Sequence, residues 1–385
     1  MAERRSGGGR PPDRRLGVMF LGAGASKAAG LPLTDELLRH IWPRAFEAGY
    51  ARWETLRSAK QWKADLEAAA RVLYPDGGSP EFRPVVSDFF TLLEVMERVH
   101  GGRERLPLDP GDLLKGLRAE IAQGLLATAA AQWRRASHLP HDGWFKAPQG
   151  RPAVVITSNW DTIVEQSAVR AGLNVQLSWP RTRSGNRLVD LPPKTVVVLK
   201  LHGSVDWGRG DDSCVVDVAA TKSWEFDRID TPISSAALRK HSREGDELLV
   251  RHRSYDHPVA SARGVRRFDE PHMATMAAGK EAFIADLGEI WDDAYWALSR
   301  ASWLDIVGYS FPADDLELRT LLRVTTRKPG QAGLASDVEV SIVNPSPDTH
   351  ERARSFLGQD ISSSFAGAES WNMRRRRPTK GGDTL

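Results

Sequence analysis

The chain has few of the features that mark secreted or membrane proteins. It contains a single cysteine, Cys214, among 385 residues, so no disulfide bond can form within it. Its longest apolar stretches have the length of strands and fall far short of the ~20 residues that cross a bilayer. The first residues, MAERRSGGGRPPDRR, are charged and lack the apolar core of a secretory signal. We therefore expect a cytoplasmic protein without a membrane segment.

Neither sign of charge dominates the chain. The net charge is +3, and arginines gather at the two ends, within residues 4–15 and in the run RRRR at 374–377. Basic arms of this composition, which we place at 1–15 and 371–385, are typical of disordered, solvated tails. The remainder is nearly neutral and no nucleic-acid motif accompanies the arms, so direct nucleic-acid binding is the less favoured alternative.

What the chain does contain is an alternation of strand and helix patterns. Apolar runs predict strands at 17–21, 153–157, 174–178, 195–200, 303–309 and 337–344. Helical spacing predicts helices over about 34–150, at 280–301, from near Asp314 and at 347–357. This alternation favours an α/β fold with a Rossmann-like, doubly wound parallel sheet. We expect a single domain over 16–370, with insertions that are helical (about 34–150) and irregular and polar (about 209–275).

The first predicted strand runs directly into a loop rich in glycine. Gly22, Gly24 and Gly30 lie in this loop, whose sequence is GAGASKAAGLP. Glycine lets the backbone approach a pyrophosphate, and the start of a helix supplies N–H donors to phosphate. The match to the dinucleotide fingerprint is imperfect, because Lys27 stands in place of the third glycine. A nucleotide phosphate site and a tight structural turn are both compatible with this loop.

Two further strands end in polar residues. Ser158, Asn159 and Asp161 follow the strand VVIT, and His202 follows the strand TVVVLKL. In an open α/β sheet, ligands bind beyond the carboxyl ends of the strands. For Asn159 a functional role is favoured. For Asp161 two interpretations are equally favoured: contact with a ligand, and capping of the next helix. His202 is favoured as a general base over a structural histidine, because imidazole exchanges protons near neutral pH.

Five motifs, in the order GAGAS with GLP, TSNWD, LHGS, IVGYSF and IVNPSP, resemble those of the sirtuin family. They are most similar to the bacterial sirtuin-like domains that consume NAD as effectors of antiphage defence. The resemblance spans about 17–345 and implies that NAD is bound as a substrate. It also implies catalysis by Asn159, which places the attacking water, and by His202, the general base. The further NAD contacts that it implies come from Gly22, Ala23, Gly24, Ser26, Asp161, Gly308, Ser310 and Asn344.

The chain departs from the sirtuin deacylases after the His-Gly motif, where those enzymes carry a four-cysteine zinc module. Segment 209–273 holds Cys214 as its one cysteine, and the spacing of His241, His252, His257 and His272 fits no zinc pattern. No bound metal is therefore expected. Without a zinc module the cleft for a lysine peptide is in doubt, and water is favoured as the acceptor.

These features predict an NAD glycohydrolase that releases nicotinamide and ADP-ribose. The resemblance implies that it depletes NAD in antiphage defence by abortive infection. Because such an activity needs restraint, we also expect a homo-oligomer or a gating partner protein, of ATPase, helicase or Argonaute type. Two alternatives remain. In the first, the same pocket would transfer ADP-ribose to a protein or remove an acyl group from one. In the second, the chain would be a non-catalytic sensor of NAD or ADP-ribose within a defence complex.

Overall fold

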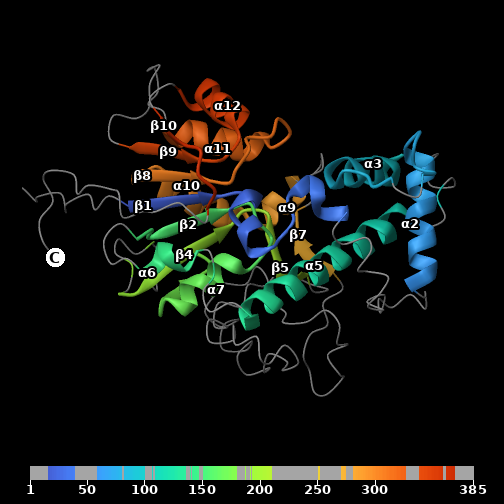
Figure 1. Ribbon diagram of the computed structural model, residues 1–385, viewed down its shortest axis with the longest axis horizontal. Helices are drawn as coiled ribbons and strands as arrows, with labels where there is room; N and C mark the ends of the chain where they lie inside the picture. Colours follow the sequence, from blue (N-terminus) through green and yellow to red (C-terminus); the bar gives the residue numbers. More distant parts are fainter. Residues whose placement is uncertain are drawn as a thin grey trace, which may run out of the picture.

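The structure is a computed structural model, and its backbone divides into a sheet with flanking helices and a group of helices that extends to one side (Figure 1). The predicted basic arms and most of segment 209–275 fall outside the part that it describes. The described residues are 16–39, 59–79, 82–99, 106, 109–135, 139, 141–146, 151–179, 187, 191, 193–209, 250–251, 270–274, 281–326, 338–358 and 361–368.

Among the described residues, seven strands form a parallel sheet in the order β10-β9-β8-β1-β2-β4-β3. β2 and β4 are buried along their whole length, as expected of parallel strands with both faces covered. The predicted Rossmann-like α/β fold class is confirmed. The strands are β1 (Leu16–Leu21), β2 (Val154–Thr157), β3 (Asn174–Gln176), β4 (Thr195–Lys200), β8 (Ala301–Val307), β9 (Glu339–Val343) and β10 (Ser362–Ser364).

The direction in which strands are added reverses at β1. The next three strands along the chain lie on one side of β1, in the spatial order β2, β4, β3. The later strands β8, β9 and β10 lie on the other side. Because crossovers between parallel strands are right-handed, the two directions place their helices on opposite faces. α7 (Ile163–Arg170) contacts β3, whereas α10 (Gly288–Leu298) contacts β1, β4 and β8 and packs beside α11 (Leu316–Thr326). The sheet is thus doubly wound, with its switch point between β1 and β8.

α12 (Pro347–Leu357) coincides with the helix predicted there, and its start explains why. The Ser346 hydroxyl accepts a hydrogen bond from the Thr349 amide (3.4 Å). Pro347 occupies the first helical position, where its missing N–H costs nothing. These two local features define the helix start without help from the rest of the fold.

The described part of the predicted helical insertion contains α2 (Ala59–Leu73), α3 (Val86–Arg98), α5 (Pro110–Arg135) and α6 (Asp142–Lys146). Figure 1 shows α2 and α3 at the far right, away from the sheet. Apolar side chains of α2, α3 and α5 form a second hydrophobic core, which also includes Trp160 and Ile163, whereas Trp144 and Phe145 of α6 belong to the main core. Since Trp160 and Ile163 follow β2, the insertion packs directly on the polar end of that strand.

The segment predicted to be irregular, 209–275, requires a correction. β5 (Gly203–Arg209) pairs in antiparallel fashion with β6 (Val250–Arg251) and β7 (Glu270–Met273). β7 therefore gives the end of the supposedly irregular segment a regular structure. The pairing joins residues far apart in the sequence, and periodicity within one segment does not reveal such contacts.

The helix predicted over 280–301 is also corrected. The structure divides it into α9 (Glu281–Asp286) and α10, which are separated at Leu287. Gly288 follows the break, and glycine is among the poorest helix formers. β8 then begins at Ala301, two residues before the predicted strand.

Candidate functional site

The predicted site residues all lie just beyond the carboxyl ends of strands in the central sheet. Backbone hydrogen bonds hold two of these ends together: the amides of Leu201 and Val205 donate to the carbonyls of Thr157 and Trp160, each at 2.9 Å. The segments that carry Asn159 and His202 therefore run side by side. The predicted residues are placed as follows: Gly22, Ala23, Gly24 and Ser26 after β1, Asn159 and Asp161 after β2, His202 after β4, Gly308 and Ser310 after β8, and Asn344 after β9.

The loop after β1 is not α-helical itself, and it precedes helical residues that begin at Thr34, where the sequence predicts them. It forms two 3-10 turns, η1 (Ala23–Ala25) and η2 (Lys27–Ala29), with Gly30 in a left-handed conformation at the end. The amides of Gly24, Ala25 and Ser26 donate to the carbonyls of Gly308, Gly22 and Ala23 at 2.9–3.1 Å. In this conformation the three amides donate hydrogen bonds to carbonyl groups of the protein, and they do not point towards a ligand from the start of a helix.

The glycines at the switch point also have a packing role. Gly308 adopts φ of 67°, and a Cβ at this position would overlap the Ala25 amide nitrogen. A Cβ on Gly24 would lie 2.9 Å from the Gly308 carbonyl oxygen. Only glycine allows the loops after β1 and β8 to approach this closely. Close packing between the two loops therefore explains why glycine occurs at these positions, a role that the sequence alone left open.

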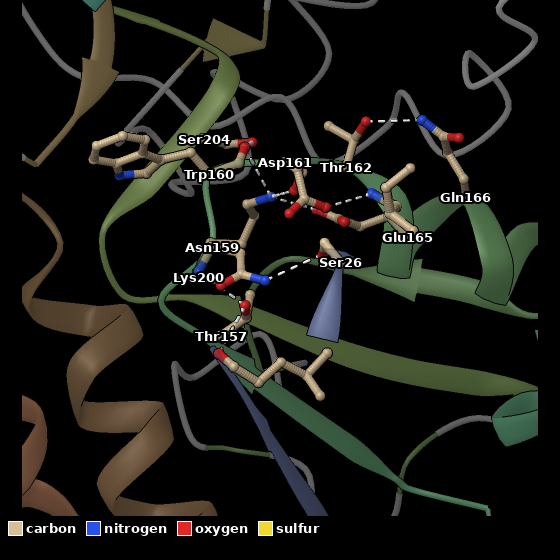
Figure 2. Close-up of polar contacts among 12 residues, drawn as sticks. Ser26, Thr157, Asn159, Trp160, Asp161, Thr162, Glu165, Gln166, Lys200 and Ser204 are labelled. Atoms are coloured by element: carbon tan, nitrogen blue, oxygen red, sulfur yellow. Dashed lines mark hydrogen bonds and ion pairs between the residues drawn. The ribbon is translucent and has the colours of Figure 1, made fainter. Parts of the chain in front are cut away.

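Asn159 lies where the end of β2 meets the glycine loop (Figure 2). Its Nδ2 atom donates to the Gly22 carbonyl oxygen (3.0 Å) and to the Ser26 hydroxyl (3.2 Å). Because a backbone carbonyl can only accept, these contacts fix which end of the amide faces the loop. The side-chain oxygen Oδ1 consequently points away from Gly22, where it can accept a hydrogen bond from a hydroxyl group or a water molecule.

Asp161 is buried, and its carboxylate has a structural role. Its Oδ1 atom accepts a hydrogen bond from the Ile163 amide (2.9 Å), the first amide of α7. This contact satisfies an otherwise unpaired donor at the helix start. Asp161 therefore supports the start of α7 from the position before its N-cap, Thr162, and contact with a ligand stays a prediction.

His202 is buried beside a carboxylate that the sequence analysis did not select. Its Nε2 atom lies 3.7 Å from Oδ1 of Asp315, in the loop after β8. Asp315 in turn accepts a hydrogen bond from the Tyr309 hydroxyl through Oδ2 (3.0 Å). Burial, reinforced by the Asp315 carboxylate, raises the pKa of Tyr309 well above its usual value, so the phenol remains a donor. The Asp315 carboxylate is therefore placed to stabilise the positive charge that an imidazole gains when it acts as a general base.

Asn344 and Ser310 are held differently from Asn159. Asn344 donates through Nδ2 to the Tyr309 carbonyl (3.4 Å) and accepts the Ser346 amide through Oδ1 (2.9 Å). The oxygen end of its amide thus holds the turn before α12, and the nitrogen end ties Asn344 to the loop after β8. Ser310 is exposed, and its carbonyl accepts a hydrogen bond from Arg352 Nε (3.0 Å). Both lie at the predicted edge, and their contacts with NAD stay predictions.

His141 is a second residue that the sequence analysis missed, and it links the helical insertion to the glycine loop. Its Nε2 atom lies 2.7 Å from the Ala25 carbonyl oxygen, and its ring packs against Trp144 in α6. Complete burial lowers the pKa of His141, although the Ala25 carbonyl and the carboxylates of Asp161 and Asp142 act in the opposite direction. The ring is therefore a neutral donor to the loop. No sequence motif marks it, because its partner lies 116 positions earlier.

No protein-family model matches the chain, and no curated protein matches it. Similar solved structures include a Sir2 homologue with NAD, at 13% identity over 91% of this chain and 84% of that chain, with a TM-score of 0.37. A mutant Sir2 homologue with 2'-O-acetyl ADP ribose covers 91% of this chain and 86% of its own at 13% identity, with a TM-score of 0.39. Similarity at this level does not establish a family.

The part of the chain that the structure describes offers neither a metal-ligand cluster nor a membrane-spanning helix. No group of three or more histidine, cysteine, aspartate or glutamate side chains that could hold a metal ion occurs among its residues. None of its helices is both long enough and apolar enough to span a bilayer. Three of the histidines considered for a metal site, at 241, 252 and 257, lie outside this part of the chain, whereas His272 is buried in β7.

Proposed function

We propose that the chain is a sirtuin-like NAD glycohydrolase, which consumes NAD as a substrate and releases nicotinamide and ADP-ribose. The observation that carries the proposal is that Asn159 and His202, which follow the neighbouring strands β2 and β4, contact the loops after β1 and β8 that flank the switch point of a doubly wound sheet. Asn159 is oriented by two hydrogen bonds to the glycine loop, and His202 lies beside Asp315 from the opposite half of the sheet. Nucleotides bind at such a switch point in folds of this class.

The chemistry needs few groups, and these residues can supply them. The bond between the ribose and nicotinamide breaks with its electron pair leaving on nicotinamide, and positive charge develops on the ribose. Water then adds to the ribose carbon and loses a proton. The Asn159 Oδ1 atom is placed to accept a hydrogen bond from water or from a ribose hydroxyl. His202 accepts the proton, and Asp315 stabilises the imidazolium that results.

The fit of a dinucleotide rests on the side chains more than on the loop amides. Asn159, Ser26 and His202 offer polar atoms at adjacent strand ends, whereas three loop amides already bond to carbonyl groups. Binding of the pyrophosphate by the loop therefore requires at least one of these internal hydrogen bonds to be exchanged for a bond to phosphate. Gly22, Ala23, Gly24, Ser26, Asp161, Gly308, Ser310 and Asn344 are proposed to contact NAD, as the sequence resemblance implies.

The proposed biological setting is depletion of NAD in antiphage defence. An enzyme that removes a central metabolite harms its own host, so its activity needs a gate, supplied by a homo-oligomer or a partner protein. The helical insertion is the proposed gating surface. In support, His141 connects it to the Ala25 carbonyl, and Trp160 packs in its hydrophobic core. A shift of α5 and α6 would therefore displace both the glycine loop and the segment that carries Asn159.

The proposal is tested by comparing variants in an assay for nicotinamide release from NAD. Asn159→Ala and His202→Ala should each abolish turnover. A matched control is Asn174→Ala, which alters an exposed asparagine on the edge strand β3 and should leave turnover unchanged. Undiminished hydrolysis by either site variant would refute the assigned mechanism. NAD binding without turnover, in the free protein and with oligomers or partners present, would instead indicate a sensor.

A further inference from the structure

Lys200 is a charged residue in a place where the sequence predicts an apolar one. It ends β4, within the run TVVVLKL, and is completely buried. Its ammonium group has three protons and three acceptors: Glu165 Oε1 (2.9 Å), the Trp160 carbonyl (3.4 Å) and the Asp161 carbonyl. Figure 2 shows these contacts from Lys200 to the segment after β2 and to α7.

Stability alone does not explain this buried pair. Glu165, in α7, is also fully buried, so both charges have lost their contact with water. Replacing a buried ion pair with apolar side chains of similar size is often neutral or even stabilising, because the charges no longer have to be desolvated. In some proteins buried charged groups of this kind are retained because they fix one specific geometry.

The geometry that Lys200 fixes is that of the candidate catalytic residues. The two carbonyls that it holds belong to Trp160 and Asp161, the residues immediately after Asn159. The Trp160 carbonyl is held further by the Ser204 hydroxyl (3.2 Å). Lys200 itself stands two residues before His202, on the neighbouring strand. One side chain thereby ties the Asn159 segment to the strand end that carries His202.

We propose that Lys200, paired with Glu165, is a positioning residue that sets the placement of Asn159 relative to His202. This inference rests on the proposed function. Lys200 is buried behind the segment and acts through its backbone rather than on the substrate. Glu165 neutralises the ammonium group of Lys200. Lys200 holds the Asn159 segment in place through its contacts with the Trp160 and Asp161 carbonyls.

Two variants separate positioning from simple structural support. Lys200→Met removes the donors and leaves Glu165 buried without this counter-charge, so it should lower Tm and turnover together. The double variant Lys200→Met with Glu165→Met removes both charges at similar volume. It should regain most of the lost Tm, whereas kcat should stay down by roughly a hundredfold with KM little changed, because small misplacements have effects of this size. Recovery of kcat together with Tm would overturn the proposal.

Glu165→Gln is a milder variant, useful if the methionine variants do not fold. It retains the lysine and its two carbonyl contacts, so kcat should stay within a few-fold of the starting protein even where Tm falls. A loss of kcat as large as that expected for Lys200→Met would mean that the lysine contacts do not set the geometry.

Amide hydrogen exchange tests the positioning role without any activity. In the double variant, peptides covering 158–164 should exchange faster than in the unmodified chain, while peptides from α12 serve as an internal control. Unchanged exchange at 158–164 would contradict the proposal. If the unmodified protein never turns over NAD, the proposed function fails, yet the exchange measurement still decides whether Lys200 holds this segment.

Discussion

Replacing His141 with Gln should change how the stability of the protein depends on pH. His141 is completely buried at the junction of the helical insertion and the glycine loop, and its Nε2 atom donates to the Ala25 carbonyl (2.7 Å). Glutamine has a side-chain N–H group at a similar reach and does not titrate. The substitution therefore preserves the contact in kind while it removes the ionisable ring.

The sign of the effect follows from the direction of the pKa shift. Burial lowers the pKa of His141 in the folded chain, against the opposing influence of the Ala25 carbonyl and the carboxylates of Asp161 and Asp142. Below the ordinary histidine pKa of about 6.5, the unfolded chain binds a proton at this position that the folded chain does not. The contribution of His141 to the free energy of unfolding is therefore complete above that pH. It decreases as the pH falls below it, by at most about 1.4 kcal/mol per pH unit.

The assay is urea unfolding, followed by tryptophan fluorescence, of both proteins at pH 7.5, 6.5 and 5.5. The other histidines contribute equally to both, so the difference between the two unfolding free energies isolates His141. That difference should shift in favour of the glutamine variant as the pH falls from 6.5 to 5.5. A difference independent of pH, or one that shifts towards the histidine form, would refute the assignment of His141 as a buried neutral donor.

Three further predictions concern the site. Gly308→Ala should lower the free energy of unfolding by about 2 kcal/mol or more, because its positive φ and its contact with Ala25 both exclude a Cβ, and a thermal melt will show the loss. Asp315→Asn should reduce kcat on the order of tenfold or more with little change in KM, since His202 loses the adjacent charge, and an unaltered kcat would remove Asp315 from the mechanism. Asp161→Ala should cost about 1 kcal/mol of stability, because the Ile163 amide loses its acceptor, and it should raise the KM for NAD; an unchanged KM would remove Asp161 from the proposed NAD contacts.

Much of the sheet could be predicted from the sequence because its strands are short apolar runs. β1, β2 and β4 are buried throughout or nearly so, and each is followed at once by polar residues. In a parallel sheet this pattern alone predicts that Asn159 and His202 share an edge. The same local reasoning predicted α12, whose cap and proline are encoded within four residues.

What the sequence did not reveal depends on contacts between distant segments. Asp315 reaches His202 from the far side of the switch point, and His141 meets Ala25 from the helical insertion. The 3-10 turns of the glycine loop also depend on a distant segment, because the loop packs against Gly308. Lys200 broke the apolar pattern of its strand, and that irregularity was the available sign of the buried pair.

The most direct test of the account is the product balance when the purified protein is incubated with NAD, alone and with candidate gating partners. Nicotinamide and free ADP-ribose are quantified by chromatography, and the intact mass of the protein is measured in the same samples. The account predicts equal amounts of the two products and an unchanged protein mass. Nicotinamide release with ADP-ribose attached to protein, or NAD binding with no release under any condition, would contradict it.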